Sequence, residues 1–222
     1  QALNKMTHII PREDWQNTLN HSSTNTISVS SFNSLRKYYR FRGKYWVDDN
    51  VKEWETRLSM HKRLLPELNV DVLCLQEAEI SCFDDFADFM QEHGYSAVRP
   101  TTKDKNSENH GHTKPSIFYK SSRLQLIWQN TRSRTVLALF EELHSKKQFY
   151  VINCHLQGGK GQEQQRCFQI RSALQQLQIH AKSQKIPEDE LICFLCGDMN
   201  STSEEPVHQW ISEGALSTEY LD

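Results

Sequence analysis

Short apolar runs of strand length alternate with longer amphipathic stretches along this chain, and that order limits the folds open to it more than any other feature. Runs rich in aliphatic and β-branched residues predict strands, whereas apolar residues at helical spacing predict helices. The predicted strands are 26–32, 70–77, 116–120, 124–129, 135–143, 149–157 and 191–196. The predicted helices are 52–68, whose end Pro66 disturbs, 82–94, which Gly94 closes, 163–184 and 203–214. This order predicts a layered α/β fold rather than a purely doubly wound sheet.

Length and charge bound the organisation of the chain. Its 222 residues suffice for one substantial domain, and we expect an N-terminal arm over 1–24 followed by one domain over 25–222. With 26 Lys and Arg against 28 Asp and Glu, the net charge is −2, so any affinity for nucleic acid must come from a local basic patch. No apolar run approaches the ~20 residues that span a bilayer, and the start lacks the features of a secretory signal.

The cysteines point to a reducing compartment. Cys74, Cys154, Cys193 and Cys196 all lie in apolar, strand-like runs, where a free cysteine behaves as a small buried hydrophobe. Cys193 and Cys196 have the C-x-x-C spacing of zinc ligands, but no second such pair accompanies them, which favours core packing over a zinc site. We therefore expect an intracellular protein with no membrane partner.

Polar side chains follow the predicted strands at the points where those strands end. Asn33 follows 26–32 and Glu77 ends 70–77, while His155 lies near the end of 149–157 and Asp198 and Asn200 follow 191–196. Each of them alone could be a cap or a turn residue. In layered α/β proteins, however, the carboxyl ends of strands commonly meet in one cleft. The set therefore predicts a single polar site.

The residue types in this set suit phosphodiester cleavage. Mg²⁺ prefers oxygen ligands, and one or two carboxylates usually hold it together with waters and substrate phosphate oxygens. Glu77 can supply such a carboxylate, with Asn33 nearby. Asp198 can orient or deprotonate a water, and His155 can donate to a phosphoryl oxygen as negative charge builds on it.

The motifs that carry these residues resemble a known superfamily. They are "SSFNSL" (30–35), "LCLQEAE" (73–79), "SIFYK" (116–120), "INCHL" (152–156) and "LCGDMNS" (195–201). In this order they resemble the endonuclease/exonuclease/phosphatase superfamily over about residues 12–216. Together with "PREDW" (11–15), "EWETR" (53–57) and the segment 200–216, they are most similar to the CCR4/Angel/nocturnin branch of deadenylase-like enzymes.

The resemblance implies a fold and roles for single residues. The fold would be a four-layered α/β sandwich of two packed mixed sheets flanked by helices. Glu77 would be the main ligand of Mg²⁺, or of Mn²⁺ as an alternative, and Asn33 a supporting active-site ligand. His155 would contact phosphate, while Asp198 and Asn200 would position the nucleophile and the scissile phosphate. The implied substrate-binding residues are Arg57, Arg166, Tyr119, Arg40 and Arg42.

Arg40 and Arg42 belong to "RKYYRFRGKYW" (36–46), which interleaves basic and aromatic residues directly after the first predicted strand. Such a composition suits single-stranded RNA, because cations follow the phosphates while rings stack on bases. The alternative is a loop whose basic side chains lie along apolar surface.

Two departures from the pattern of the superfamily stand out. The pattern ends in a strand with an Asp and then a Ser-Asp-His motif, and neither follows Asp198, so we expect a C-terminally incomplete domain without its last strands. The segment 114–116 (Lys-Pro-Ser) also stands where an Asp-Gly pair is usual.

Three hypotheses for the function follow. The first is a Mg²⁺-dependent phosphodiesterase, a 3′ exoribonuclease of the deadenylase-like type that acts on RNA by in-line attack of water, alone or within a larger protein complex. The second is a phosphatase or phosphodiesterase of the same fold for a small molecule such as a nucleotide or inositol phosphate. The third is a non-catalytic RNA-binding module without the last motif.

Overall fold

The structure, a computed structural model, describes residues 26–35, 53–79, 83–99 and 113–213. Its strands are β1 (Val29–Asn33), β2 (Val72–Glu79), β3 (Tyr95–Val98), β4 (Thr113–Lys120), β5 (Leu124–Thr131), β6 (Thr135–Glu142), β7 (Gln148–His155) and β8 (Cys193–Asp198). Its helices are α2 (Trp54–Glu67), α3 (Phe83–Glu92), α4 (Glu163–Ser183), the 3₁₀ turn η4 (Glu188–Glu190) and α5 (Pro206–Glu213). The predicted N-terminal arm lies outside the described residues.

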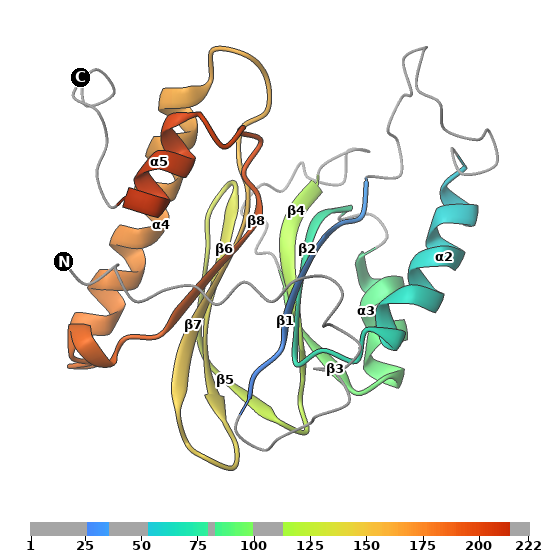
Figure 1. The fold of residues 1–222 in the computed structure, drawn as a ribbon. Coiled ribbons are helices and arrows are strands. Elements are labelled where there is room, and N and C mark those ends of the chain that lie inside the picture. The colour runs from blue at the N-terminus through green and yellow to red at the C-terminus, as the bar shows by residue number, and fades with distance from the viewer. Residues whose placement is uncertain (1–25, 36–52, 80–82, 100–112, 214–222) are drawn as a thin grey trace.

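The strands form two mixed sheets that face each other (Figure 1). Sheet A has the order β1-β2-β4-β3, with β1 parallel to β2 and the other pairs antiparallel. Sheet B has the order β5-β6-β7-β8, with β7 parallel to β8 and the other pairs antiparallel. Each sheet therefore contains one parallel pair whose carboxyl ends meet at the same edge.

The helices cover the outer faces of the two sheets, so the chain forms four layers (Figure 1). The inner faces pack through a buried cluster that includes Val72 and Ile117 from sheet A and Val136 and Val151 from sheet B. Helix α4 covers sheet B through Ala173 and its neighbours, and α5 packs against the same layer. This arrangement confirms the four-layered α/β sandwich of two mixed sheets flanked by helices.

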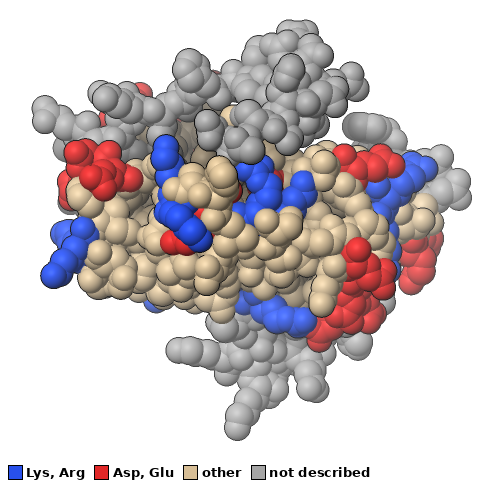
Figure 2. Space-filling view, turned by 90° about the horizontal axis from the view of Figure 1, so that it is seen from below, with Lys and Arg blue, Asp and Glu red and all other residues tan. Residues whose placement is uncertain are grey.

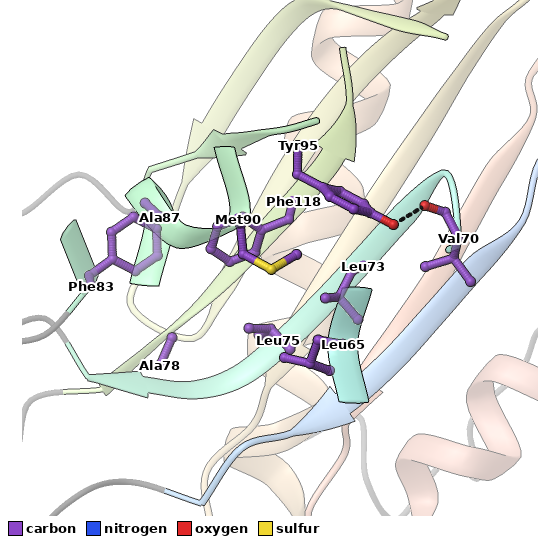
Figure 3. Close-up of a cluster of buried hydrophobic side chains, with 10 residues drawn as sticks. All are labelled: Leu65, Val70, Leu73, Leu75, Ala78, Phe83, Ala87, Met90, Tyr95 and Phe118. Carbon is purple, nitrogen blue, oxygen red and sulfur yellow. Dashed lines mark hydrogen bonds between the residues drawn. The ribbon is translucent and has the colours of Figure 1, made fainter. Parts of the chain in front are cut away.

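Helices α2 and α3 cover the outer face of sheet A (Figure 3). Leu65 of α2 and Met90 of α3 are completely buried against Leu73 of β2. Burying an aliphatic side chain of this size contributes about 1.5–3 kcal/mol. The hydroxyl of Tyr95 donates to the carbonyl of Val70 at 2.7 Å, which satisfies the polar end of an otherwise apolar contact. This cluster holds β2 against the two helices.

The boundaries of the elements follow local chemistry. Pro66 lies in the last turn of α2, and Gly94 follows α3 with φ +82°, a conformation that glycine adopts without steric cost. Strand β3, which the sequence did not predict, is a four-residue segment that pairs with β4. Cys193 packs toward α4, whereas Cys196 packs between the sheets, so the C-x-x-C pair is divided between the two faces of β8.

On the face of the molecule seen from below, neither charge dominates. Figure 2 shows basic and acidic side chains in several separate groups on the face seen from below. This mixture agrees with the net charge of −2. Among the helices that the structure describes, none combines the length and apolar character needed to cross a bilayer.

Candidate active site

Four predicted site residues meet where the parallel strand pairs of the two sheets end. Asn33 lies at the end of β1 and Glu77 near the end of β2, while His155 and Asp198 end β7 and β8 and face each other in register. The Asn33 amide donates from Nδ2 to Glu77 Oε1 at 3.1 Å and to Asp198 Oδ2 at 3.0 Å. One amide group thus joins carboxylates from both sheets.

A β-bulge sets the direction of Glu77. The ladder between β2 and β4 pairs Leu75 with Ser116 and then Ala78 with Lys114, so Gln76 and Glu77 together oppose Pro115. Proline has no N–H to donate to a ladder, and within a sheet it is confined to edges and bulges. Glu77 has φ +58°, a left-handed conformation that costs a non-glycine residue about 1–3 kcal/mol. Surrounding contacts must therefore hold it in place.

Asp198 lies between two residues with positive φ. Gly197 (φ +129°) passes so close to β7 that a Cβ there would lie 2.0 Å from the carbonyl oxygen of Cys154. Asn200 (φ +48°) donates from its backbone N–H to Asp198 Oδ1 at 2.8 Å and from Nδ2 to the carbonyl of Leu156 at 2.9 Å. The Asp-Met-Asn segment is therefore a turn and also the support of the Asp198 carboxylate.

His155 lies beside both carboxylates in a largely buried position. Its Nε2 is 3.9 Å from Glu77 Oε1 and 4.0 Å from Asp198 Oδ2, longer than a hydrogen bond. Burial lowers the pKa of His155, and the Arg134 charge lowers it further, whereas the two carboxylates raise it. The net shift is downward, so the imidazole is neutral at neutral pH and can serve as a hydrogen-bond donor without carrying a charge.

The donor set of the site fits a hard divalent cation. Glu77 and Asp198 present carboxylate oxygens, and their side chains are 15% and 33% exposed. Within the described ranges, no three or more His, Cys, Asp or Glu side chains are close enough to form a metal site by themselves. Mg²⁺ does not need such a cage, because it retains waters and shares substrate phosphate oxygens. The Asn33 amide oxygen accepts a hydrogen bond from Leu35 N–H at 2.9 Å. In this arrangement Asn33 therefore turns its N–H groups, and not its oxygen, toward the two carboxylates.

The two predicted arginines in described segments are both buried. Arg57 on α2 lies over the ring of Trp54 at 5.6 Å. Burial lowers its pKa, and the charges of Glu53, Glu55 and Glu77 offset part of that shift, so Arg57 lies within electrostatic reach of the site. Arg166 on α4 is 1% exposed. It donates to the carbonyls of Gln157 and Gly159 and, at 2.7 Å, to the Glu205 carboxylate. Arg166 therefore connects the loop after β7 to the segment before α5, and has no exposed face for a substrate.

The other predicted substrate contacts are not brought to the site. Tyr119 pairs with Val72 at the start of β2, whereas Glu77 lies near the end of that strand, and its ring packs on Phe140 at 4.9 Å. Tyr119 thus belongs to the core between the sheets, at the opposite end from the site. Arg40 and Arg42 lie outside the described residues.

Sequence reasoning missed three residues near the site. Gln76 and Asn153 are buried polar side chains that join the two sheets beneath Glu77 and His155. Arg134, in the turn between β5 and β6, donates to Gln157 Oε1 at 2.8 Å and lies near His155. A polar residue inside an apolar run was the available signal for the first two. Arg134 had no signal beyond its charge.

Comparison with known proteins agrees with this geometry. The model of the Endonuclease/Exonuclease/phosphatase family matches residues 49–222. Among curated proteins, the Ccr4 exoribonuclease subunit of the CCR4-Not complex from Debaryomyces hansenii is 24% identical over 91% of this chain and 29% of its own length. Nocturnin from Rattus norvegicus is 27% identical over 74% of this chain and 40% of its own length. The chain thus spans about a quarter to two fifths of the length of such relatives.

Solved structures share the fold. The human nocturnin catalytic domain with bound sulfate superposes with a TM-score of 0.66 at 24% identity, over 83% of this chain and 68% of that one. ANGEL2, described as a 2′,3′-cyclic phosphatase, gives a TM-score of 0.69 at 22% identity, over 87% and 58% of the two chains.

Proposed function

Because the chain belongs to the endonuclease/exonuclease/phosphatase family, we propose that it carries active-site residues of a Mg²⁺-dependent phosphodiesterase that shortens RNA from its 3′ end. One observation carries the proposal: Asn33, Glu77, His155 and Asp198 converge from four strands of two sheets. The named activity of the Ccr4 relatives, 3′-5′ exoribonuclease, supports the choice of RNA as substrate.

The difference in exposure between the Glu77 and Asp198 side chains favours different chemical roles for the two carboxylates. Glu77 is the more enclosed of the two, so it would hold the metal, with the Asn33 amide orienting its carboxylate. Bound Mg²⁺ would supply electrophilic stabilisation of the phosphoryl oxygens. Asp198 is the more exposed, and its two oxygens each accept one N–H, from Asn33 and from Asn200. These bonds leave lone pairs that could accept the proton of an attacking water.

The remaining residues would hold the substrate phosphate. The neutral His155 would donate to a non-bridging oxygen as charge develops there. Asn200 would keep the Asp198 carboxylate in place through its backbone N–H. In the reaction, the water oxygen would bond to phosphorus as Asp198 takes up a proton of the water, the bond from phosphorus to the ribose oxygen would break, and that oxygen would take up a proton from solvent as it leaves.

The test is hydrolysis of a 5′-labelled oligo(A) by the full-length natural protein with Mg²⁺. We expect stepwise shortening, and a loss of at least about 100-fold in rate for Glu77→Gln and for Asp198→Asn. Asp85→Asn, at an exposed carboxylate on α3, is the matched control and should retain the rate of the wild-type protein. Glu77→Gln with an unchanged rate would refute the proposal. Preferential hydrolysis of a small phosphate such as a 2′,3′-cyclic nucleotide would favour the second hypothesis over the first.

A further inference from the structure

The bulge in β2 removes ladder hydrogen bonds, and a side chain from the other sheet replaces them. Between the pairs Leu75–Ser116 and Ala78–Lys114 the ladder is interrupted. Buried carbonyls in such a gap need another donor. Asn153 of β7 donates from Nδ2 to the carbonyl of Leu75 and to that of Ser116, both at 2.8 Å. The Asn153 side chain thus reaches across the core between the sheets and supplies hydrogen bonds to two carbonyls of sheet A beside the bulge.

Gln76 completes this link next to Glu77. Its Nε2 donates to Asn153 Oδ1 at 2.8 Å, and also to Ser31 Oγ and the Cys74 carbonyl, both at 3.1 Å. On the β1 side, Ser34 donates to the carbonyl of Gln76 from its backbone N–H at 3.0 Å and from its hydroxyl at 2.9 Å. Gln76, the residue before Glu77, is therefore held by Ser34 after β1 and by Asn153 of sheet B.

Because both side chains are buried, the loss of any of these hydrogen bonds would leave a polar group without a partner. Asn153 is 0% exposed and Gln76 is 2% exposed, so water cannot replace a lost partner. Glu77, the next residue, holds a left-handed φ of +58° that its own side chain does not favour. Asn153 also lies two residues before His155, on the same face of β7. Strand β7 of sheet B therefore affects the positions of both Glu77 and His155.

We propose that Asn153, acting through Gln76, is a positioning residue that holds Glu77 in its left-handed conformation and so sets the affinity of the site for a divalent cation. The inference rests on the proposed function, because it takes Glu77 as the metal ligand. A purely structural bridge between the sheets would lower stability when removed but would leave cation affinity intact. A positioning role lowers both.

The experiment measures binding of Mn²⁺ to the substrate-free, full-length protein by electron paramagnetic resonance, together with urea unfolding. Asn153→Leu keeps the side-chain volume but removes both hydrogen-bonding groups of the amide. We expect its Mn²⁺ dissociation constant to rise about tenfold, equivalent to about 1.4 kcal/mol. Gln76→Met, which keeps the length of the side chain and leaves the two bonds from Asn153 in place, should raise the constant in the same direction and is the milder variant if Asn153→Leu does not fold.

The matched control lies directly before β2, at the end of the strand away from Glu77. Asp71 is 3% exposed and pairs with Arg123 at 3.0 Å, far along the strand from Glu77. Asp71→Asn should therefore lower stability but keep the Mn²⁺ dissociation constant of the wild-type protein. Unchanged Mn²⁺ affinity in Asn153→Leu or Gln76→Met, with a loss of stability like that of Asp71→Asn, would overturn the inference. Unchanged affinity in Glu77→Gln would instead overturn the proposed function.

Discussion

Gly197→Ala would test how closely β7 and β8 must approach for the site to form. A Cβ at this position would lie 2.0 Å from the carbonyl oxygen of Cys154 and 2.7 Å from its nitrogen. These are backbone atoms of a central strand, so the contact can be relieved only if the two strands separate by about 1 Å. Separation would strain the bond from Leu156 N–H to the Asp198 carbonyl, which is 2.9 Å long.

The expected cost has two parts. A φ of +129° lies outside the left-handed helical region and is unfavourable for alanine by about 1–3 kcal/mol, and overpacking costs about 1–3 kcal/mol. The free energy of unfolding should therefore fall by about 2–6 kcal/mol. Gly94→Ala is the matched control, because Gly94 also has a positive φ (+82°) but no atom within 4 Å of the added carbon. It should cost only the conformational part, which for its φ is about 1–2 kcal/mol.

Urea unfolding of both variants provides the measurement, with equal slopes as the sign that the unfolding reaction is unchanged. Because Asp198 follows Gly197 directly, we also expect Gly197→Ala, and not Gly94→Ala, to slow the hydrolysis of oligo(A). Equal losses of stability in the two variants would show that the close approach of β7 and β8 does not constrain this position, and would refute the reasoning.

Three further predictions concern His61, Arg166 and Tyr119. Burial, with Arg57 nearby, lowers the pKa of His61 to about 4. Between pH 6.5 and pH 4 the unfolded chain therefore binds a proton at His61 that the folded chain does not, and the free energy of unfolding should fall by about 2 kcal/mol over that range. Urea titrations of His61→Phe should lack this part of the pH dependence. Arg166→Met should cost about 2–3 kcal/mol in a thermal unfolding measurement, because it removes the donor of the Gln157 and Gly159 carbonyls and the cation beside the part-exposed Glu205 carboxylate. Arg171→Met on the exposed face of α4 should cost less than about 0.5 kcal/mol. Tyr119→Phe should leave KM for oligo(A) unchanged, and a raised KM would show that its hydroxyl reaches the substrate.

Most of the fold could be predicted because periodicity reports which faces are buried. The helix predicted over 163–184 is α4 to within one residue, and the strand predicted over 124–129 lies within β5. Strand β3 was missed because four residues are too few to show a period. The predicted strand 70–77 also stopped short of Glu79, since nothing in its own sequence shows that β2 continues through a bulge opposite Pro115.

The candidate site, too, could be predicted only in part from the sequence. Asn33, Glu77, His155 and Asp198 could be placed together because parallel strands bring their carboxyl ends to one edge. Arg166 and Tyr119 could not be placed, since the position of a motif along the chain does not say where a long side chain finds its partners. The bond between Gln76 and Asn153 depends on how two sheets are aligned face to face, and neither strand contains that information.

The site therefore depends on the packing of the whole sandwich rather than on any single motif. Sheet A supplies Asn33 and Glu77, sheet B supplies His155 and Asp198, and the Asn33 amide joins the two carboxylates across the junction. Because a close-packed core does not deform continuously, the cluster between the sheets fixes the spacing of these groups before any ligand binds. A part-exposed carboxylate such as Asp198 can then keep a defined position without being fully buried. For the same reason, changes in the inter-sheet core should alter the geometry of the site even where they touch none of its residues.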